Sequence, residues 1–451
     1  MRRVDWFPIG IAFAVWATFF AIIFVERWQA SQRAGFDEAR LARIDAHYQA
    51  AFDNGEMPGA RAVIYQGGEI VYERNWGFQD IASKTPIKAD TIFHIYSMTK
   101  PITSVAVMML FEEGKFLLHE PIAKYIPELA DLRVYDAENG TGNPPTRRAV
   151  RQPTIHDVLT HSAGFTYGLF DLSPVGDMYR QDGFELSAAI DLQQFVARLG
   201  KLPLRYDPGT KWNYSVSTDV LGRLVEVASG MSLGAFLKTR LFDPLGMKDT
   251  GFTYQADSRD RVATLYSPEG IPGQFAEKGF LSQPSGPGLE PAHKGLLTPY
   301  HPDALLQSGG GGLISTTDDY LRFARMLLNG GALDDVRILS PISVNMMRHD
   351  ALGDIKSGQR LTSIMPKQGI GFGLGFGVIT DQSQSGLIMP AQSYFWGGAA
   401  GTIFWIDPQN DLIALFMTQI VPHRTTLRQD MWPLTYQAMT KLPKNRKDAR
   451  R

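Results

Sequence analysis

A serine and a lysine three residues apart form the most reactive combination in this sequence. The stretch HIYSMTKPITSVAVMMLFEEG contains Ser97 and Lys100, and its apolar residues recur at helical spacing as far as Gly114. Pro101 falls in the first turn, where a missing N–H group costs nothing, so Ser97 would lie at the positive end of the helix dipole. A desolvated lysine one turn away can lose its proton and activate the hydroxyl. The same residues also fit a serine N-cap beside a solvated lysine.

A second serine lies in the pattern G-x-S-x-G, at Gly230–Gly234. A nucleophile elbow of this kind needs a buried strand running into the turn, but the residues on both sides have helical spacing. Gly230 fits the C-cap of one helix and Ser232 the N-cap of the next. We therefore predict a structural role for Ser232.

Strand patterns occur near both ends of the chain, where they could position such a site. ARAVIYQ and EIVYERNWG flank Gly67-Gly68, and GTIFWIDP and DLIALFMTQ flank Gln409-Asn410, so each pair predicts a hairpin. Helical patterns cover residues 37–54 and 427–442, and GFGLGFGV (371–378) predicts a strand with one bare face. Together they predict an antiparallel sheet built from the two chain ends, with a mostly helical insertion between them.

Composition excludes several functional classes. The chain has 451 residues, is 44% hydrophobic and 20% charged, and carries a formal net charge of -1. This gives a sizeable core and no electrostatic support for nucleic-acid binding. The absence of cysteine excludes disulfides and thiolate chemistry, and the nine histidines form no H-x-x-x-H pattern. We expect neither a metal nor a cofactor.

The N-terminus contains an uncharged run of 20 residues, Trp6–Val25. A helix of that length spans about 30 Å, the thickness of the hydrocarbon core of a bilayer. Arg2 and Arg3 precede it, and no small-residue cleavage pair follows it. We predict an uncleaved anchor within residues 1–30, spanning the membrane over about 7–25, a globular domain over 36–442, and a basic tail over 443–451. A cleaved signal peptide is the alternative.

Further motifs, in order along the chain, extend the pattern around Ser97 and Lys100. They are VLTHSAGF (158–165), YDPGTKWNYSVSTDVLGRLVE with Tyr214, FDPLGMKDTGF (242–252), GGGGLISTTDDYLRFARMLLNGG (309–331) and YFWGGAAGTIFWIDP with Trp396-Gly397-Gly398. With these motifs the chain resembles the serine β-lactamase and penicillin-binding-protein superfamily. It is most similar to the class C-like branch of esterases and related membrane hydrolases.

The resemblance implies an α/β sandwich: an antiparallel sheet from both chain ends, flanked by helices, beside a helical subdomain with the active site between them. Ser97 would be the acylated nucleophile, Lys100 its proton acceptor, and Tyr214 a second acid/base. The backbone N–H groups of Ser97 and Ala399 would form the oxyanion hole. The substrate-binding residues would be Val216, Trp396, Gly397 and Gly398.

Two positions depart from the lactamase pattern. Val216 replaces an asparagine that hydrogen-bonds an amide side chain, and Trp396 replaces a lysine that binds a substrate carboxylate. Both departures favour uncharged acyl substrates. His161 could serve as a triad base, but a buried histidine satisfied by the backbone is the simpler interpretation.

The sequence therefore predicts a cofactor-free serine hydrolase that acts on a small-molecule ester through an acyl-enzyme. We expect a single-pass protein of the bacterial inner membrane, held by its N-terminal helix, with the catalytic domain on the periplasmic side. A peptidase, amidase or β-lactamase of the same fold is one alternative. A catalytically silent, membrane-bound binding protein is the other.

Overall fold

The computed structural model describes residues 35–442, except 255, 279–281, 297–299, 301–302, 358–365 and 424. The predicted anchor and the predicted basic tail lie outside these residues. Within the described part, no single helix has the length and apolar composition to cross a membrane. One pair of helical segments, Ser217–Ser229 and Leu233–Leu245, bent by 76°, meets that test by length and composition only.

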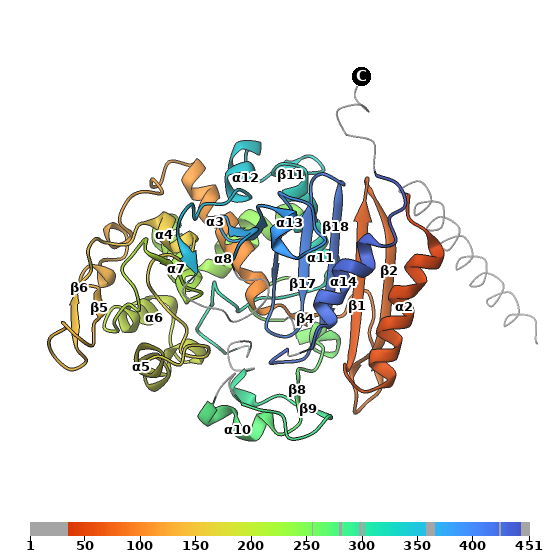
Figure 1. The fold of residues 1–451 in the computed structure, drawn as a ribbon, viewed down its shortest axis with the longest axis horizontal. Helices are drawn as coiled ribbons and strands as arrows, with labels where there is room; N and C mark the ends of the chain where they lie inside the picture. The colour runs from red at the N-terminus through yellow and green to blue at the C-terminus, as the bar shows by residue number, and fades with distance from the viewer. Residues whose placement is uncertain are drawn as a thin grey trace, which may run out of the picture.

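An eight-stranded sheet joins the two ends of the chain, as predicted (Figure 1). Every neighbouring pair is antiparallel, and β1 pairs with β2 on one side and with β18 on the other. Both predicted hairpins are present, around Gly67-Gly68 and Gln409-Asn410. The strands, in sheet order, are β14 (Ile370–Phe372), β15 (Gly377–Ile379), β16 (Tyr394–Gly397), β17 (Ile403–Asp407), β18 (Leu412–Thr418), β1 (Gly59–Gln66), β2 (Glu69–Asp80) and β3 (Thr85–Pro86).

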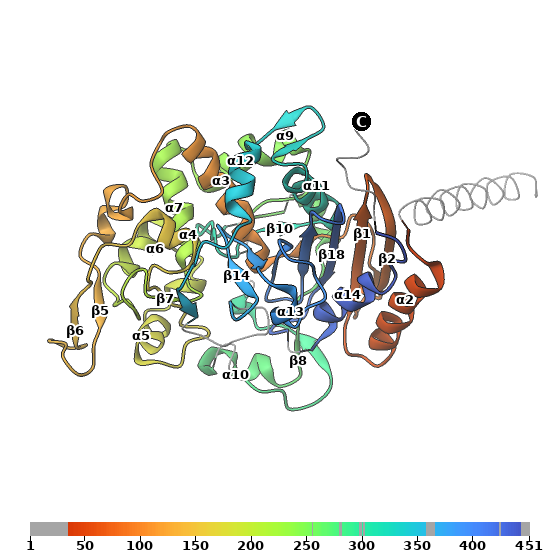
Figure 2. The same cartoon turned by 45° about the horizontal axis from the view of Figure 1, so that its top comes forward.

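Both faces of the central strands are buried, and alternate residues of β1 and β18 enter different cores. In β18, Ala414 and Phe416 pack in one core, whereas Ile413 and Leu415 pack in the other. The first core lies under α2 (Glu38–Asp53) and α14 (Leu427–Tyr436), which lie side by side in both ribbon views (Figure 1, Figure 2). The second core is larger and continues into the helical part of the molecule.

The C-terminal helix is shorter than the predicted range 427–442, because α14 ends at Tyr436. The chain then extends alongside the segment that precedes α2. Asp37 donates a backbone hydrogen bond to Ala438, at 2.9 Å, and Thr440 donates one to Gly35, at 2.8 Å. Pairing between the two ends of the domain therefore replaces the last helical turns.

The glycine-rich run 371–378 forms two strands, so the prediction of a single strand was wrong. The chain reverses between β14 and β15, where the Gly373 N–H donates to the Phe376 carbonyl at 2.8 Å. Gly375 takes φ = +97° in this turn, and a Cβ there would lie 2.3 Å from Ser104 Oγ. The bare surface does receive a close neighbour, as predicted, and that neighbour is helix α3 (Thr99–Glu112).

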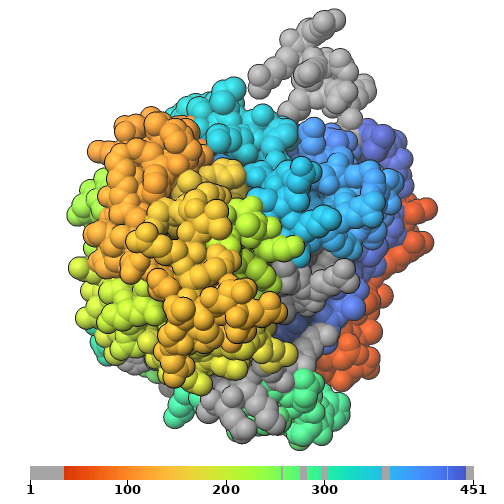
Figure 3. Space-filling model, turned by 60° about the vertical axis from the view of Figure 1, so that its left-hand side comes forward, coloured from red at the N-terminus to blue at the C-terminus, as the bar shows by residue number. Residues whose placement is uncertain are grey.

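The middle of the chain forms a helical region beside the sheet (Figure 1). Helix α3 lies between the two parts, and its residues from Thr99 to Leu110 are all buried. In Figure 3 the helical region, orange to yellow-green, meets the blue C-terminal part along the forward face. Its helices are α4 (Ile155–Leu159), α5 (Pro174–Asp182), α6 (Leu192–Leu199), α7 (Ser217–Ser229), α8 (Leu233–Leu237) and α9 (Asp243–Leu245).

Shorter elements connect these parts. The remaining helices are α10 (Ile271–Lys278), α11 (Thr317–Leu328), α12 (Pro341–Met347) and α13 (Gln382–Ser385). The remaining strands are β4 (Phe93–His94), β5 (Arg133–Tyr135), β6 (Thr146–Arg148), β7 (Lys211–Trp212), β8 (Tyr266–Pro268), β9 (Leu289–Pro291), β10 (Ile314–Ser315), β11 (Ala332–Leu333), β12 (Val336–Arg337) and β13 (Lys356–Ser357).

The G-x-S-x-G segment is a helix-to-helix turn, as predicted. Gly230 is the left-handed C-cap of α7, with φ = 71°. Ser232 is the N-cap of α8, and its side chain accepts the Ala235 N–H at 3.2 Å. Ser232 therefore stabilises a helix start.

Candidate active site

Ser97 lies in a single 3₁₀ turn, η1 (Tyr96–Met98), that leads directly into α3. Tyr96 has φ = 43°, a conformation that non-glycine residues rarely adopt and that costs about 1–3 kcal/mol. The surrounding structure holds this turn: the Ile95 N–H donates to Leu313 at 3.1 Å, and the Tyr320 hydroxyl donates to the Met98 carbonyl at 2.9 Å. Strain of this kind, one residue before a serine, is typical of a functional turn.

Lys100 is buried beside Ser97, with only 1% of its surface exposed. Its Nζ donates to Ser97 Oγ at 3.3 Å, to the Tyr167 hydroxyl at 3.1 Å and to the Gly310 carbonyl at 2.6 Å. The alternative of a solvated lysine is therefore wrong. A buried ammonium group needs such acceptors, because an unpaired one would cost several kcal/mol.

The loop that receives Lys100 contains four consecutive glycines, 309–312. A Cβ on Gly310 would lie 2.5 Å from Asp219 Oδ2 and 2.9 Å from the Tyr167 hydroxyl. Asp219 holds this loop, because its Oδ1 accepts from Ser308 Oγ at 2.5 Å and from the Gly310 N–H at 3.1 Å. The pKa of Asp219 is raised above its ordinary value, because the effect of burial outweighs the opposing charge of Lys100. Gly310 thus lets a carboxylate, a phenol and an ammonium group meet.

Two tyrosines flank Lys100, and only Tyr214 was predicted from the sequence. Lys100 Nζ lies 4.7 Å from the centre of the Tyr214 ring and hydrogen-bonds to Tyr167. Burial, followed by the charge of Asp219, raises the pKa of Tyr167 well above its usual value, so its hydroxyl keeps its proton. Tyr167 comes two residues after VLTHSAGF, and nothing in that spacing indicates that it reaches Lys100.

The residues that replace the lactamase side chains are both buried. Trp396 is 2% exposed, and its ring centre lies 5.5 Å from that of Tyr214 and 5.2 Å from that of Phe372. Its ring packs against Tyr214, and Trp396 is not among the residues that line the cavity at Ser97. Val216 does line that cavity. Trp396 therefore makes an aromatic packing contact with Tyr214, and its contact with substrate stays a prediction.

His161 is a buried histidine, as the simpler interpretation predicted, although its partner is a side chain. Its Nδ1 lies 3.1 Å from Ser215 Oγ, and its ring packs 5.0 Å from the Tyr214 ring. Burial, with a smaller contribution from Lys100, lowers its pKa well below the usual value. A neutral histidine hydrogen-bonded to Ser215 supports the walls of the site.

The turn after β16 brings Ala399 to the same cavity as Ser97. The Gly398 N–H donates to Thr402 at 2.8 Å and the Gly401 N–H to Gly398 at 3.2 Å, which closes the turn. A Cβ on Gly398 would lie 2.4 Å from the Ile95 carbonyl oxygen, so only glycine allows this turn to pack against the chain that enters Ser97. The Ala399 N–H donates to no backbone carbonyl in the described part of the chain.

The cavity at Ser97 holds about 80 Å³, room for several water-sized groups. Its walls combine aromatic and aliphatic side chains with a few polar groups. They include Tyr96, Tyr167, Phe170, Tyr300, Val216 and Glu185. Such a cavity suits a short acyl group.

Glu185 is one of two carboxyl groups in this lining, together with Asp219. Its Oε1 accepts the Gly168 N–H at 2.6 Å and its Oε2 accepts the Leu169 N–H at 3.3 Å. Both donors belong to the loop that carries Tyr167, so Glu185 fixes that loop. Burial raises the pKa of Glu185 to about 7, against an ordinary value of 4.5, and the two backbone donors oppose this rise.

A sequence model of the family described as "Beta-lactamase" matches residues 44–433, most of the chain. The chain belongs to the β-lactamase family. Esterase EstB of Burkholderia gladioli is 32% identical over 388 residues, which cover 85% of this chain and 91% of that protein. Protein Rv1367c of Mycobacterium tuberculosis is 36% identical over 375 residues, which cover 82% and 88%.

A solved structure of EstCE1, a hydrolase with promiscuous acyltransferase activity, superposes with a TM-score of 0.71 at 24% identity. The match covers 88% of this chain and 99% of that one, and it shows the same fold. With its family and its esterase relative, the chain is a serine hydrolase of the esterase-like type.

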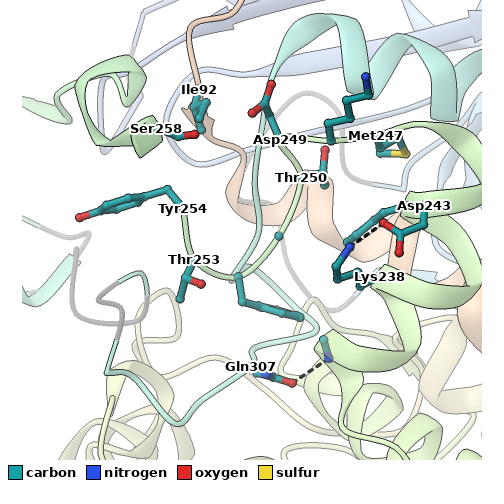
Figure 4. A pocket seen from close by; sticks show the side chains of 15 residues that line it. Ile92, Lys238, Asp243, Met247, Asp249, Thr250, Thr253, Tyr254, Ser258 and Gln307 are labelled. Atoms are coloured by element: carbon teal, nitrogen blue, oxygen red, sulfur yellow. Dashed lines mark hydrogen bonds and ion pairs between the residues drawn. The ribbon is translucent and has the colours of Figure 1, made fainter. Parts of the chain in front are cut away.

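A second cavity, of about 240 Å³, is drawn in Figure 4, and Ser97 is not among its lining residues. Several of its polar groups already have partners: Lys238 pairs with Asp243 at 2.6 Å, and Gln307 accepts the Gly234 N–H at 2.7 Å. Asp249 pairs with Arg261 at 3.1 Å. The cavity at Ser97 is therefore the better candidate for the active site, although it is the smaller of the two.

Replacing Gly310 tests the geometry around Lys100. The Cβ of a Gly310→Ala variant would press on Asp219 and Tyr167, so we expect the free energy of unfolding to fall by about 1–3 kcal/mol. Labelling of the nucleophile by a fluorophosphonate should slow as well. Gly311→Ala is the control, because its Cβ would meet nothing closer than 3.9 Å. Equal stability and labelling in the two variants would contradict the close approach described here.

The raised pKa of Glu185 predicts a pH dependence of stability. Because the folded state favours the neutral carboxyl, its contribution is fully present below pH 4.5 and is lost as pH rises through about 7. Glu185→Gln stays neutral and still offers an acceptor to the Tyr167 loop. Its melting temperature relative to wild type should therefore be higher at pH 8 than at pH 5.

The exposed Glu138→Gln is the control, and its difference from wild type should be the same at both pH values. If the melting-temperature difference between Glu185→Gln and wild type is the same at pH 5 and pH 8, the pKa of Glu185 is not raised in the folded protein.

Proposed function

We propose that the protein is a membrane-anchored carboxylic-ester hydrolase that forms an acyl-enzyme on Ser97. The contact between Ser97 Oγ and Lys100 Nζ, 3.3 Å long and made by a lysine that is 1% exposed, is the main support. The cavity beside it is lined by aromatic groups and by Ala399. A catalytically silent binding protein would have no need to bury an ammonium group against a serine.

A neutral Lys100 would donate its two N–H groups to the Gly310 carbonyl and the Tyr167 hydroxyl, which leaves its lone pair for Ser97. In this mechanism that lone pair accepts the proton of Ser97 Oγ as the oxygen attacks the ester carbonyl carbon. The carbonyl oxygen becomes an anion and is held by the backbone N–H groups of Ser97 and Ala399. The C–O bond to the alcohol then breaks, and the alcohol leaves with a proton delivered through Lys100 and Tyr214. A water molecule reverses these proton transfers to release the acid and restore Ser97.

The side chains around the cavity favour neutral esters over β-lactams and peptides. A β-lactam carries a carboxylate, and the cavity lining at Ser97 has Glu185 where that charge would be repelled once the carboxyl ionises. Trp396 supplies no cation, and Val216 supplies no amide for an acylamido side chain. A short-chain ester carries neither group and leaves no buried polar atom unpaired.

Kinetics with esters and a cephalosporin test this proposal. We expect hydrolysis of p-nitrophenyl acetate or butyrate, with β-lactam turnover lower by orders of magnitude. Ser97→Ala should abolish hydrolysis, and Lys100→Ala and Tyr214→Phe should each lower turnover by about 10²–10⁴-fold with the fold retained. His161→Ala should mainly lower the melting temperature.

Ser232→Ala is the matched control, and it should keep full activity because its hydroxyl only caps α8. A kcat/KM for the cephalosporin above that for every ester would contradict the ester assignment. A stable but inactive His161→Ala variant would transfer the role of the base to His161.

The membrane location is part of the proposal and rests on the sequence. The uncharged run Trp6–Val25 is long enough to span a bilayer, and Arg2 and Arg3 favour an N-terminus inside. The catalytic domain would then lie on the periplasmic side of a bacterial inner membrane.

Deletion of residues 1–30 should move the protein from the membrane fraction to the soluble fraction and leave ester hydrolysis intact. The reason is that the catalytic residues and both cores begin after this segment. Fractionation and N-terminal sequencing of the full-length protein measure this. A mature N-terminus after residue 25 would show a cleaved signal instead.

A further inference from the structure

Arg428 is a buried cation close to the proposed oxyanion hole, and no step of the mechanism above uses it. It is the second residue of α14 and is only 8% exposed. Its Nη1 donates to the Gly398 carbonyl oxygen at 3.0 Å. It forms no salt bridge with a carboxylate in the described part of the chain, and its Nε has no hydrogen-bond partner there.

The acceptor of Arg428 belongs to a particular peptide unit. The Gly398 carbonyl and the Ala399 N–H are the two ends of the same planar amide, and in a trans amide they point in opposite directions. A guanidinium group fixed on the oxygen side therefore turns the N–H to the other side. Ala399 lines the cavity that contains Ser97, so that other side is where the substrate carbonyl would lie.

Two effects make this contact more than a packing contact. First, a cation at the oxygen of an amide polarises it and strengthens its N–H as a donor. Second, a buried positive charge without a carboxylate partner is costly unless negative charge forms nearby. Burial lowers the pKa of Arg428 to about 10, so the group remains charged at neutral pH.

The rest of the turn is held independently of Arg428. The Gly401 N–H also donates to the Gly398 carbonyl, at 3.2 Å, and the His423 N–H donates to the Ala399 carbonyl at 3.2 Å. The turn can therefore survive removal of the guanidinium group. What would be lost is the polarisation of the amide and one of the two hydrogen bonds that orient it.

We propose that Arg428 is a positioning residue for the oxyanion hole: it holds the Gly398–Ala399 peptide so that the Ala399 N–H points at the developing oxyanion on the Ser97 adduct. The inference rests on the proposed acyl-enzyme function. It assigns a role in the transition state, with little effect on the binding of the ground-state ester.

The test compares Arg428→Gln and Arg428→Lys with the wild-type protein. Three quantities are measured: the rate of acylation by p-nitrophenyl acetate, KM, and the affinity for an arylboronic acid, which forms a tetrahedral anionic adduct on serine. Arg428→Gln should slow acylation by about 10–100-fold, less than the roughly 10²–10³-fold cost of removing an oxyanion-hole donor itself, because the Ala399 N–H remains. Boronate affinity should fall by a similar factor, while KM changes little.

Arg428→Lys keeps a cation with a different donor geometry, so a smaller loss of both quantities in parallel is expected. It also tests the proposal if the glutamine variant does not fold. Tyr436→Phe is the matched control on the same helix, since the Tyr436 hydroxyl bonds Asp407 at 2.9 Å. This control should lower the melting temperature without changing acylation.

A variant with a lower melting temperature but wild-type acylation and boronate affinity would overturn the proposal. So would a rise in KM confined to substrates that carry a carboxylate, which would make Arg428 a substrate-binding group. A wild-type protein that is never acylated would instead refute the proposed function, so the two failures are distinguishable.

Discussion

The buried ammonium group of Lys100 is the constraint on which the rest of the site depends. A lysine that is 1% exposed needs acceptors on every side, and the fold supplies them from three separate segments. Ser97 Oγ comes from the 3₁₀ turn that leads into α3, the Tyr167 hydroxyl from the helical region, and the Gly310 carbonyl from the glycine loop. The burial of α3 on all sides places this helix where these segments converge.

The sheet and the helical region each contribute part of the site. The sheet has a core on each face, which fixes the position of β16. The turn that carries Ala399 follows directly after this strand. The helical region provides Tyr167, Tyr214 and the walls of the cavity. The chain that carries Ser97 runs between them, and the unusual conformation of Tyr96 directs it there.

The replacement of polar lactamase side chains by large apolar ones changes the site in two ways. Trp396 fills its position with an aromatic ring that packs on Phe372 and Tyr214, so this position holds no cation. A positive charge is still present nearby, on Arg428, but it faces the back of the Gly398 peptide. This arrangement fits the proposed preference for a neutral ester, because the cation lies behind the proposed oxyanion hole.

Local signals in the sequence were sufficient for several features. Hairpin turns, helix caps at Gly230 and Ser232, and a serine-lysine pair at the start of a helix all depend on residues close together in the chain. The family motifs added the architecture and the candidate residues. The errors at the end of α14 and in the run 371–378 arose where distant segments pair or pack and override the local pattern.

Only the tertiary structure revealed which groups complete the site. Tyr167 and Gly310 lie 67 and 210 residues from Lys100 in the chain, and no spacing rule relates them to it. Arg428 likewise meets Gly398 only because α14 packs against the sheet. The sequence by itself determined the reactive pair and the elements that carry it. The packing of distant segments decided which groups bury and hold Lys100 and which group contacts the neighbouring Gly398 peptide. The reason is that the burial of a charge depends on what surrounds it in space.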